Sequence, residues 1–109
     1  MTPEMAAKKG VEVTVAIDFR SIGRQRIQKS VSVAEGSTVF DALRKVIPVV
    51  TSCKFGADHF VESIDGVSND FASDRGWHFE VNGHRSNVPA ERYLVKRGDW
   101  IEWLYIEGP

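Results

Sequence analysis

The stretch that most constrains the fold spans residues 76–106 and holds two segments rich in β-forming residues. The first, Trp77–Val81, leads into Asn82-Gly83, a pair that favours a tight hairpin turn. The second, Trp100–Ile106, follows the chain reversal that Gly98-Asp99 predicts, and both of its faces carry apolar side chains. Such a strand is typical of the interior of a sheet. We therefore expect this region to form the centre of a β-sheet.

An N-terminal hairpin is predicted to extend this sheet. Apolar and polar residues alternate over 11–19, which indicates a strand with one buried face. A turn over 20–25 leads into a second alternating segment over 27–33, in which Lys29 interrupts the apolar face. We expect the two segments to pair in an antiparallel manner.

A short helix is predicted between the two β-rich regions. Thr38 is followed three residues later by Asp41, a short-armed version of the capping box that begins helices. Pro48 ends the helix after about three turns, because proline cannot continue it. Its apolar side consists of Val39, Phe40, Leu43, Val46 and Ile47.

The remaining segments are short or irregular. We interpret 49–59 as a mixed loop that holds Cys53, and Phe60–Ile64 as a short strand that ends in an Asp65-Gly66 turn. The polar segment 68–76 is predicted to be an exposed loop on the rim of the sheet.

This element order predicts an α+β fold, a mixed sheet of about four to six strands with one helix packed across one face. A helix covers one face only, so the other face is expected to be solvated or used for binding. With 109 residues, of which 42% are apolar, the chain suffices for one core. We divide it into a flexible N-terminus at 1–10 and a single domain at 11–107.

Charge and composition exclude several classes of partner and site. The formal net charge of −1 gives no general attraction to nucleic acid. The single cysteine, Cys53, excludes an intramolecular disulfide, and no apolar run is long enough to span a membrane. We expect a cytoplasmic protein if Met1 is the native start, and an exported or cell-surface protein if the chain is an excised domain.

Four motifs together resemble a bacterial family of unknown function that is similar to the C-terminal β-domain of the cobalamin carriers transcobalamin and intrinsic factor. They are a helix start, an Ile-Asp-Gly turn, a Gly-Trp hairpin and a closing strand, here Gly36 to Leu43, Ile64-Asp65-Gly66, Gly76-Trp77 to Asn82-Gly83, and Gly98-Asp99 to Tyr105. The resemblance implies a β-grasp-like fold of the ubiquitin-like kind. It brings no catalytic residues and no cofactor, and cobalamin binding is only an analogy, because cobalamin carriage belongs to two-domain relatives.

The chain also contains no motif of an established enzyme class, such as a nucleophile elbow, a P-loop or a zinc-protease helix. We therefore interpret it as a non-enzymatic binding module for a small molecule or a glycan. Aromatic rings offer flat ligands a large contact area, and the polar loops at one end of the sheet supply hydrogen bonds. The candidate ligand-binding residues are Phe71, Asp74, Arg75, Trp77, His78, Arg85, Asn87 and Trp100.

Side-chain alternation places Trp77 and Trp103 toward the core and leaves Trp100 at an exposed position. The alternative function is a protein-interaction or self-assembly module that uses an exposed sheet edge, and the sequence leaves the oligomeric state open. We predict no metal site, because His78 and Glu80 match no known ligand spacing. The arginines of segment 20–26 favour a charged turn over a phosphate site.

Overall fold

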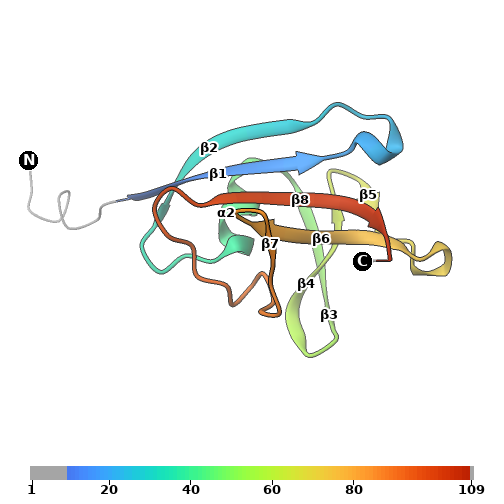
Figure 1. The fold of residues 1–109 in the computed structure, drawn as a ribbon. Coiled ribbons are helices and arrows are strands. Elements are labelled where there is room, and N and C mark those ends of the chain that lie inside the picture. Colours follow the sequence, from blue (N-terminus) through green and yellow to red (C-terminus); the bar gives the residue numbers. More distant parts are fainter. Residues whose placement is uncertain (1–9, 109) are drawn as a thin grey trace, which may run out of the picture.

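The computed structural model describes residues 10–108, which form two β-sheets and one α-helix (Figure 1). The expected flexible N-terminus lies outside this part of the chain except for Gly10, which begins the first strand. The elements are β1 (Gly10–Asp18), η1 (Arg20–Ile22), β2 (Ile27–Ala34), α2 (Val39–Val46), β3 (Val49–Lys54), β4 (Ala57–Ile64), β5 (Val67–Ser68), η2 (Phe71–Ser73), β6 (Arg75–Val81), β7 (His84–Arg85) and β8 (Trp100–Glu107).

The large sheet is mixed, with the strand order β2-β1-β8-β6-β7. β1 pairs with β2 in an antiparallel manner and with β8 in a parallel manner, while β6 and β8 are antiparallel. The predicted N-terminal hairpin is therefore confirmed. The closing strand β8 lies inside the sheet, as its two apolar faces indicated. The α+β class with a mixed sheet and one helix is also confirmed.

Helix α2 begins at the predicted capping box. The Thr38 hydroxyl accepts a hydrogen bond from the Asp41 amide at 3.1 Å, and the Asp41 carboxylate accepts one from the Thr38 amide at 2.9 Å. The helix has eight residues and ends at Val46, so it is about one turn shorter than the sequence suggested. The reason is that Ile47 is already extended in front of Pro48, as residues before proline usually are. Its buried side contacts β1 and β2.

The expected loop at 49–59 was wrong, because this segment forms β3 and the start of β4. Together with β5 these strands make a second sheet, in the order β3-β4-β5. Phe55-Gly56 forms the two-residue turn between them, with φ angles of 55° and 78°. Two register shifts in the β3–β4 pairing disturb the alternation of side chains, and phenylalanine is not a turn residue. Both features hide this hairpin in the sequence.

The segment 68–76 is an exposed loop only in part. Phe71 is exposed, as expected, but Arg75 and Gly76 already belong to β6, and Gly76 is buried. The Asp65-Gly66 turn is confirmed, with φ angles of 49° and 82°.

Helix α2 and the small sheet both lie behind the large sheet in Figure 1. The core lies between these layers and includes Val13, Val15 and Ile17 of β1, Leu43 of α2, Ile64 of β4 and Ile101 of β8. Trp77 and Trp103 are buried, whereas Trp100 is 38% exposed, which confirms the alternation argument. The opposite side of the large sheet carries Thr14, Trp100, Glu102 and Leu104, and we call it the open face.

Polar side chains tie the small sheet to the large one. The Asn69 side chain accepts a hydrogen bond from the Trp77 amide at 2.8 Å and donates one to the Val61 carbonyl at 2.9 Å. The Trp77 indole donates to the Val67 carbonyl at 2.8 Å, and the Tyr105 hydroxyl donates to a carbonyl of β5 at the same distance. Asn69 therefore bridges the two layers directly.

We predict that Asn69→Ala lowers the free energy of unfolding by about 1 to 3 kcal/mol, because the Trp77 amide and the Val61 carbonyl lose their partner at a half-buried position. Urea denaturation followed by circular dichroism measures this loss. The control variant Glu35→Ala changes an exposed side chain and should stay within about 0.5 kcal/mol of the parent. Equal stability of the two variants would contradict the bridging role of Asn69.

Candidate functional site

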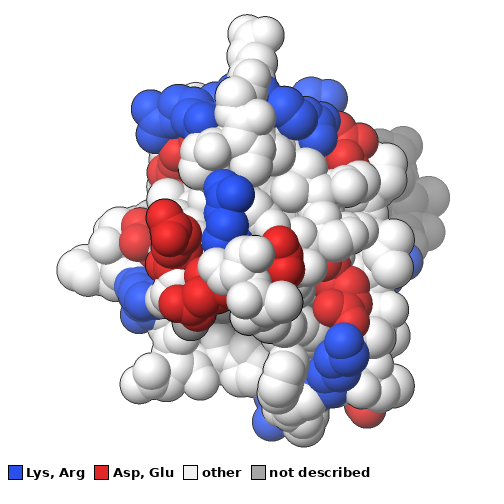
Figure 2. Space-filling view, turned by 90° about the vertical axis from the view of Figure 1, so that its right-hand side faces the viewer, with Lys and Arg blue, Asp and Glu red and all other residues white. Residues whose placement is uncertain are grey.

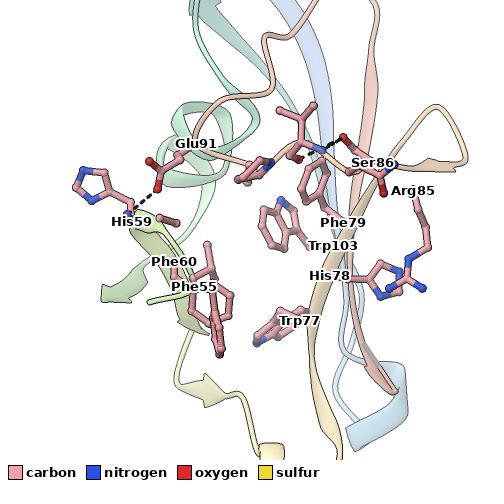
Figure 3. A pocket seen from close by; sticks show the side chains of 16 residues that line it. Phe55, His59, Phe60, Trp77, His78, Phe79, Arg85, Ser86, Glu91 and Trp103 are labelled. Atoms are coloured by element: carbon pink, nitrogen blue, oxygen red, sulfur yellow. Dashed lines mark hydrogen bonds between the residues drawn. The ribbon is translucent and has the colours of Figure 1, made fainter. Parts of the chain in front are cut away.

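A cleft of about 300 Å³ lies where the small sheet, β6 and the loop 85–91 meet (Figure 3). We call it the aromatic cleft, since five aromatic side chains form most of its walls: Phe55, Phe60, Trp77, Phe79 and Trp103. Its polar mouth is formed by His59, Ser86, Asn87 and Glu91. Ligand sites combine an apolar lining with a few polar groups in this way.

The two walls of the cleft come from different sheets. Phe79 and Trp103 lie on neighbouring strands of the large sheet, with ring centroids 5.2 Å apart. Phe55 and Phe60 lie on the small sheet in an edge-to-face contact at 4.9 Å. Figure 3 shows these two groups facing each other, with Trp77 at one end.

Phe55 has the most unusual environment among the cleft residues. It occupies the tip of the β3–β4 hairpin with a φ of 55°, and it is 76% exposed. A bulky side chain rarely adopts this left-handed conformation, and strained residues of this kind cluster at binding sites. Phe71 contacts Phe55 and Phe60 at centroid distances of 6.1 and 6.3 Å, so it extends the aromatic surface beyond the cleft.

The mouth is braced by hydrogen bonds between the small sheet and the loop. The Glu91 carboxylate accepts a hydrogen bond from the His59 amide at 2.7 Å. The His59 ring stacks on Phe40 of α2 at 5.4 Å. Within the loop, the Ser86 hydroxyl accepts a hydrogen bond from the Val88 amide at 2.8 Å. The hydrogen bond from His59 to Glu91 therefore ties the small sheet to the loop at the mouth of the cleft.

The structure distributes the predicted ligand-binding residues over three places. Trp77, His78, Arg85 and Asn87 line the cleft, although Figure 3 shows His78 and Arg85 on the side of β6 away from the aromatic walls. Phe71 lies beside the cleft, as described above. Asp74 and Arg75 lie at the far end of β6, where the Arg75 guanidinium is 5.2 Å from the Tyr105 ring. Trp100 lies on the open face.

Sequence reasoning missed Phe55, Phe60, Phe79 and Trp103 as site residues. Trp103 was assigned to the core by alternation, and both Trp103 and Phe79 do face the covered side of the sheet. Phe55 carried one detectable signal, because its position before Gly56 fits a two-residue turn. The pairing of β3 with β4 had to be known before that signal could be used.

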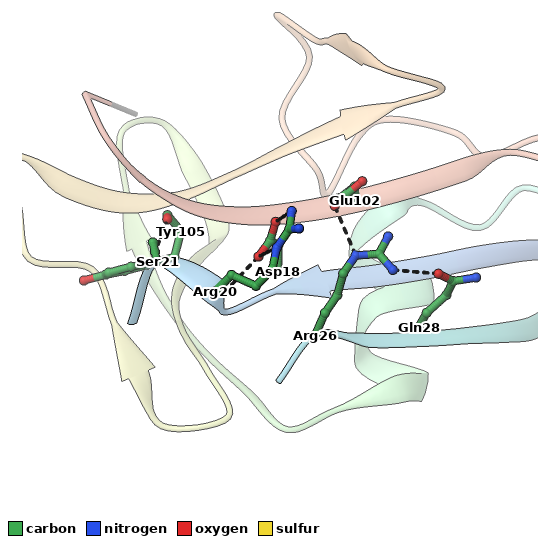
Figure 4. A network of polar contacts seen from close by, with 7 residues as sticks. All are labelled: Asp18, Arg20, Ser21, Arg26, Gln28, Glu102 and Tyr105. Atoms are coloured by element: carbon green, nitrogen blue, oxygen red, sulfur yellow. Dashed lines mark hydrogen bonds and ion pairs between the residues drawn. The ribbon is translucent and has the colours of Figure 1, made fainter. Parts of the chain in front are cut away.

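The arginines of the first turn are paired with carboxylates, which favours the charged-turn interpretation over a phosphate site. Arg24 contacts Asp65 at 2.6 Å. Figure 4 shows Arg20 on Asp18 at 2.6 Å and Arg26 near Glu102 at 3.5 Å. The hydrogen bond from Arg20 lowers the pKa of Asp18 below its usual value, against the opposing effect of burial.

Charges of both signs are mixed on the end of the molecule shown in Figure 2, where Lys and Arg lie among Asp and Glu. The expectation that the chain does not bind nucleic acid stays a prediction. Within residues 10–108, no three His, Cys, Asp or Glu side chains converge as a metal site would require. No helix in the same part of the chain has the length and apolarity to cross a membrane.

Comparison with known proteins gives a family and a fold. Residues 36–107 match the model of a domain of unknown function, DUF4430. A comparison with curated proteins found no match. The match to the family model confirms the resemblance to a family of unknown function that the sequence motifs indicated.

Two solved structures share the fold. Haptocorrin in complex with Cbi is 16% identical with a TM-score of 0.78, over 92% of this chain and 26% of the haptocorrin chain. This chain therefore spans about a quarter of haptocorrin. A candidate metal-binding protein from Ruminococcus gnavus ATCC 29149 is 17% identical with a TM-score of 0.65, over 94% of this chain and 100% of that protein. At these identities the likeness shows the fold.

We predict that His78 makes the fold less stable in mild acid. Its side chain is 14% exposed, and burial lowers its pKa, helped by Arg85 and opposed by Glu80. Near pH 6.5 the His78 side chain therefore takes up a proton in the unfolded chain but stays neutral in the folded chain. The contribution of neutral His78 to the free energy of unfolding is fully present above this pH, and it is lost as the pH falls toward the pKa of the folded state.

Thermal melts between pH 7.5 and pH 5 measure this effect. His78→Leu should reduce the fall in melting temperature across this range, whereas His84→Gln, at an exposed position, should keep the parent profile. An unchanged profile for His78→Leu would contradict the prediction.

Proposed function

The chain belongs to the DUF4430 family, and from this premise we propose that the aromatic cleft binds a small molecule with a flat, largely apolar body. The observation that carries the proposal is the convergence of five aromatic side chains from two sheets around one cleft with a polar mouth. Aromatic walls give a flat ligand a large contact area at a low cost in side-chain entropy. The polar groups at the mouth would fix its orientation.

The size of the cleft limits the ligand. About 300 Å³ lies at the lower end of the range for small-molecule sites. A ligand of a few fused rings fits inside, whereas a corrinoid or an oligosaccharide would insert one edge or one unit and leave the rest outside. Haptocorrin, which was solved in complex with Cbi, supports the corrinoid case by analogy. The exposed ring of Phe55 offers a surface on which a sugar ring could stack, and this supports the glycan case.

The role we propose is binding without catalysis. The titratable side chains of the mouth serve in structural contacts, because Glu91 holds the His59 amide and the His59 ring stacks on Phe40. Cys53 donates a hydrogen bond to the Asp58 carbonyl at 3.6 Å and does not line the cleft. These contacts support a site that holds a ligand by shape and stacking.

The edge of β2 supports a second candidate function, the addition of a strand from a protein partner. The Glu12 carbonyl and the Thr14 amide form hydrogen bonds on the β8 side of β1. Ser32 and Ser30 of β2 lie opposite these two residues, so the backbone N–H and C=O groups of both serines point away from β1. Lys45 donates to the Ser32 carbonyl at 3.2 Å and protects part of this edge. Lys29 protects it further, since a charge beside an edge strand opposes pairing.

We predict that a cleft ligand shifts the indole N–H signals of Trp77 and Trp103 in ¹H–¹⁵N spectra and leaves that of Trp100 unchanged. Cobinamide and cobalamin are the first probes. Phe55→Asn should weaken binding about tenfold, because one aromatic wall is lost. The fold should stay within about 1 kcal/mol of the parent, since asparagine suits the left-handed position.

Trp100→Ala is the matched control, because it removes an aromatic side chain from the open face and leaves the cleft intact. Its affinity for the probe should equal that of the parent. If a probe shifts the Trp100 signal and binds Phe55→Asn as tightly as it binds the parent, the binding site lies on the open face and not in the cleft.

For the strand-addition function, we predict that the chain is monomeric in light scattering at all concentrations tested, because Lys29 and Lys45 protect the β2 edge. If the parent does associate, Ser30→Pro tests whether the β2 edge is responsible. Proline at this position removes the backbone N–H that points away from β1, and it leaves the hydrogen bonds between β1 and β2 intact. A dimer of the parent that Ser30→Pro dissociates would support strand addition in place of our expectation.

A further inference from the structure

The two tryptophans of the aromatic cleft differ in their hydrogen bonding. The Trp77 indole N–H donates to the Val67 carbonyl at 2.8 Å. The Trp103 side chain is also buried, at 3% exposure, but its Nε1 finds no acceptor among residues 10–108. Figure 3 shows the Trp103 ring in the large-sheet wall of the cleft, beside Phe79.

An unpaired N–H at this position is unfavourable. A buried donor without a partner costs about 1 to 3 kcal/mol, and buried tryptophans usually find an acceptor. Phenylalanine would give a similar aromatic wall without this loss. The N–H therefore calls for an acceptor that the described chain does not supply but that an occupant of the cleft can.

We propose that Trp103 Nε1 is the recognition donor of the cleft, and that the ligand is a flat apolar molecule carrying a neutral carbonyl or amide oxygen that accepts this hydrogen bond. The inference rests on the proposed function and deepens it by naming the polar group of the ligand. The oxygen is neutral because the walls around Trp103 are aromatic, and a carboxylate buried there without a cation would be far more costly.

The loop 86–88 gives the oxygen a way in. Its hydrogen bonds are local, between Ser86 and Val88 at 2.8 and 3.2 Å. Val88 is 44% exposed. Firm attachment to the rest of the fold resumes at Ala90, whose carbonyl accepts from the Phe40 amide at 3.0 Å. A shift of this loop breaks no sheet hydrogen bond and would open a path to the buried Trp103 Nε1.

A matched pair of probes tests the proposal: 1-indanone, which carries a carbonyl, and indane, which has the same ring system without it. Ligand-observed NMR titrations give the two affinities, and ¹H–¹⁵N spectra follow the Trp103 indole signal. We expect 1-indanone to bind about five- to tenfold tighter than indane, which is the value of one hydrogen bond. It should also move the Trp103 signal downfield.

Trp103→Phe should retain indane binding and lose the preference for 1-indanone, whereas Trp100→Phe on the open face should keep the preference. Equal affinities for the two probes with an unmoved Trp103 signal would overturn the proposal and leave the cleft as a binding site. A preference for 1-indanone that persists in Trp103→Phe would also overturn the proposal and leave the cleft as a binding site. If that variant does not fold, the Trp103 signal of the parent decides. Absence of binding by either probe, with no shift at Trp77 or Trp103, would count against the cleft itself.

Discussion

The structure depends on a mismatch of size between its one α-helix and its main sheet. Helix α2 has eight residues and is about 12 Å long. Strands β2 and β8 also have eight residues each, but extended chain of that length covers about 26 Å. The four long strands of the sheet span a further 14 Å or so across. One short helix cannot keep water from such a surface, so a second element must cover the rest.

The small sheet β3-β4-β5 is that element, and the way in which it attaches creates the cleft. Helix α2 lies against β1 and β2, whereas the small sheet contacts β6. Asn69, Trp77 and Tyr105 fix β5 closely to the large sheet, but the β3–β4 hairpin extends past this attachment. Between the hairpin and β6 the two layers separate, and the aromatic side chains that would otherwise close the core line a cleft.

The sequence predicted those elements whose signals are local. The capping box of Thr38 and Asp41 placed the start of the helix, and side-chain alternation separated Trp103 from Trp100 correctly. The β3–β4 hairpin escaped because its turn is Phe55-Gly56 and its register shifts interrupt the alternation. The site residues were chosen as aromatic and polar side chains expected at one end of the sheet, and this grouping joined Trp100 to Trp77 although they lie on opposite faces. A cleft between two sheets requires the strand order, which no local signal contains.

The aromatic cleft holds a buried polar group that the described chain leaves without a hydrogen-bond partner. On the open face, Arg20 and Arg26 contact carboxylates, so the charges there are satisfied within the chain. Three residues of the described chain, Arg75, His78 and Trp103, hold buried side-chain nitrogens without a hydrogen-bond partner, and of these only Trp103 lies among the aromatic walls of the cleft. The strained backbone of Phe55 lies at the same cleft. An unsatisfied donor and a strained backbone, either of which would weaken a purely structural surface, thus lie at one cleft, where a bound molecule can compensate for the missing hydrogen bond.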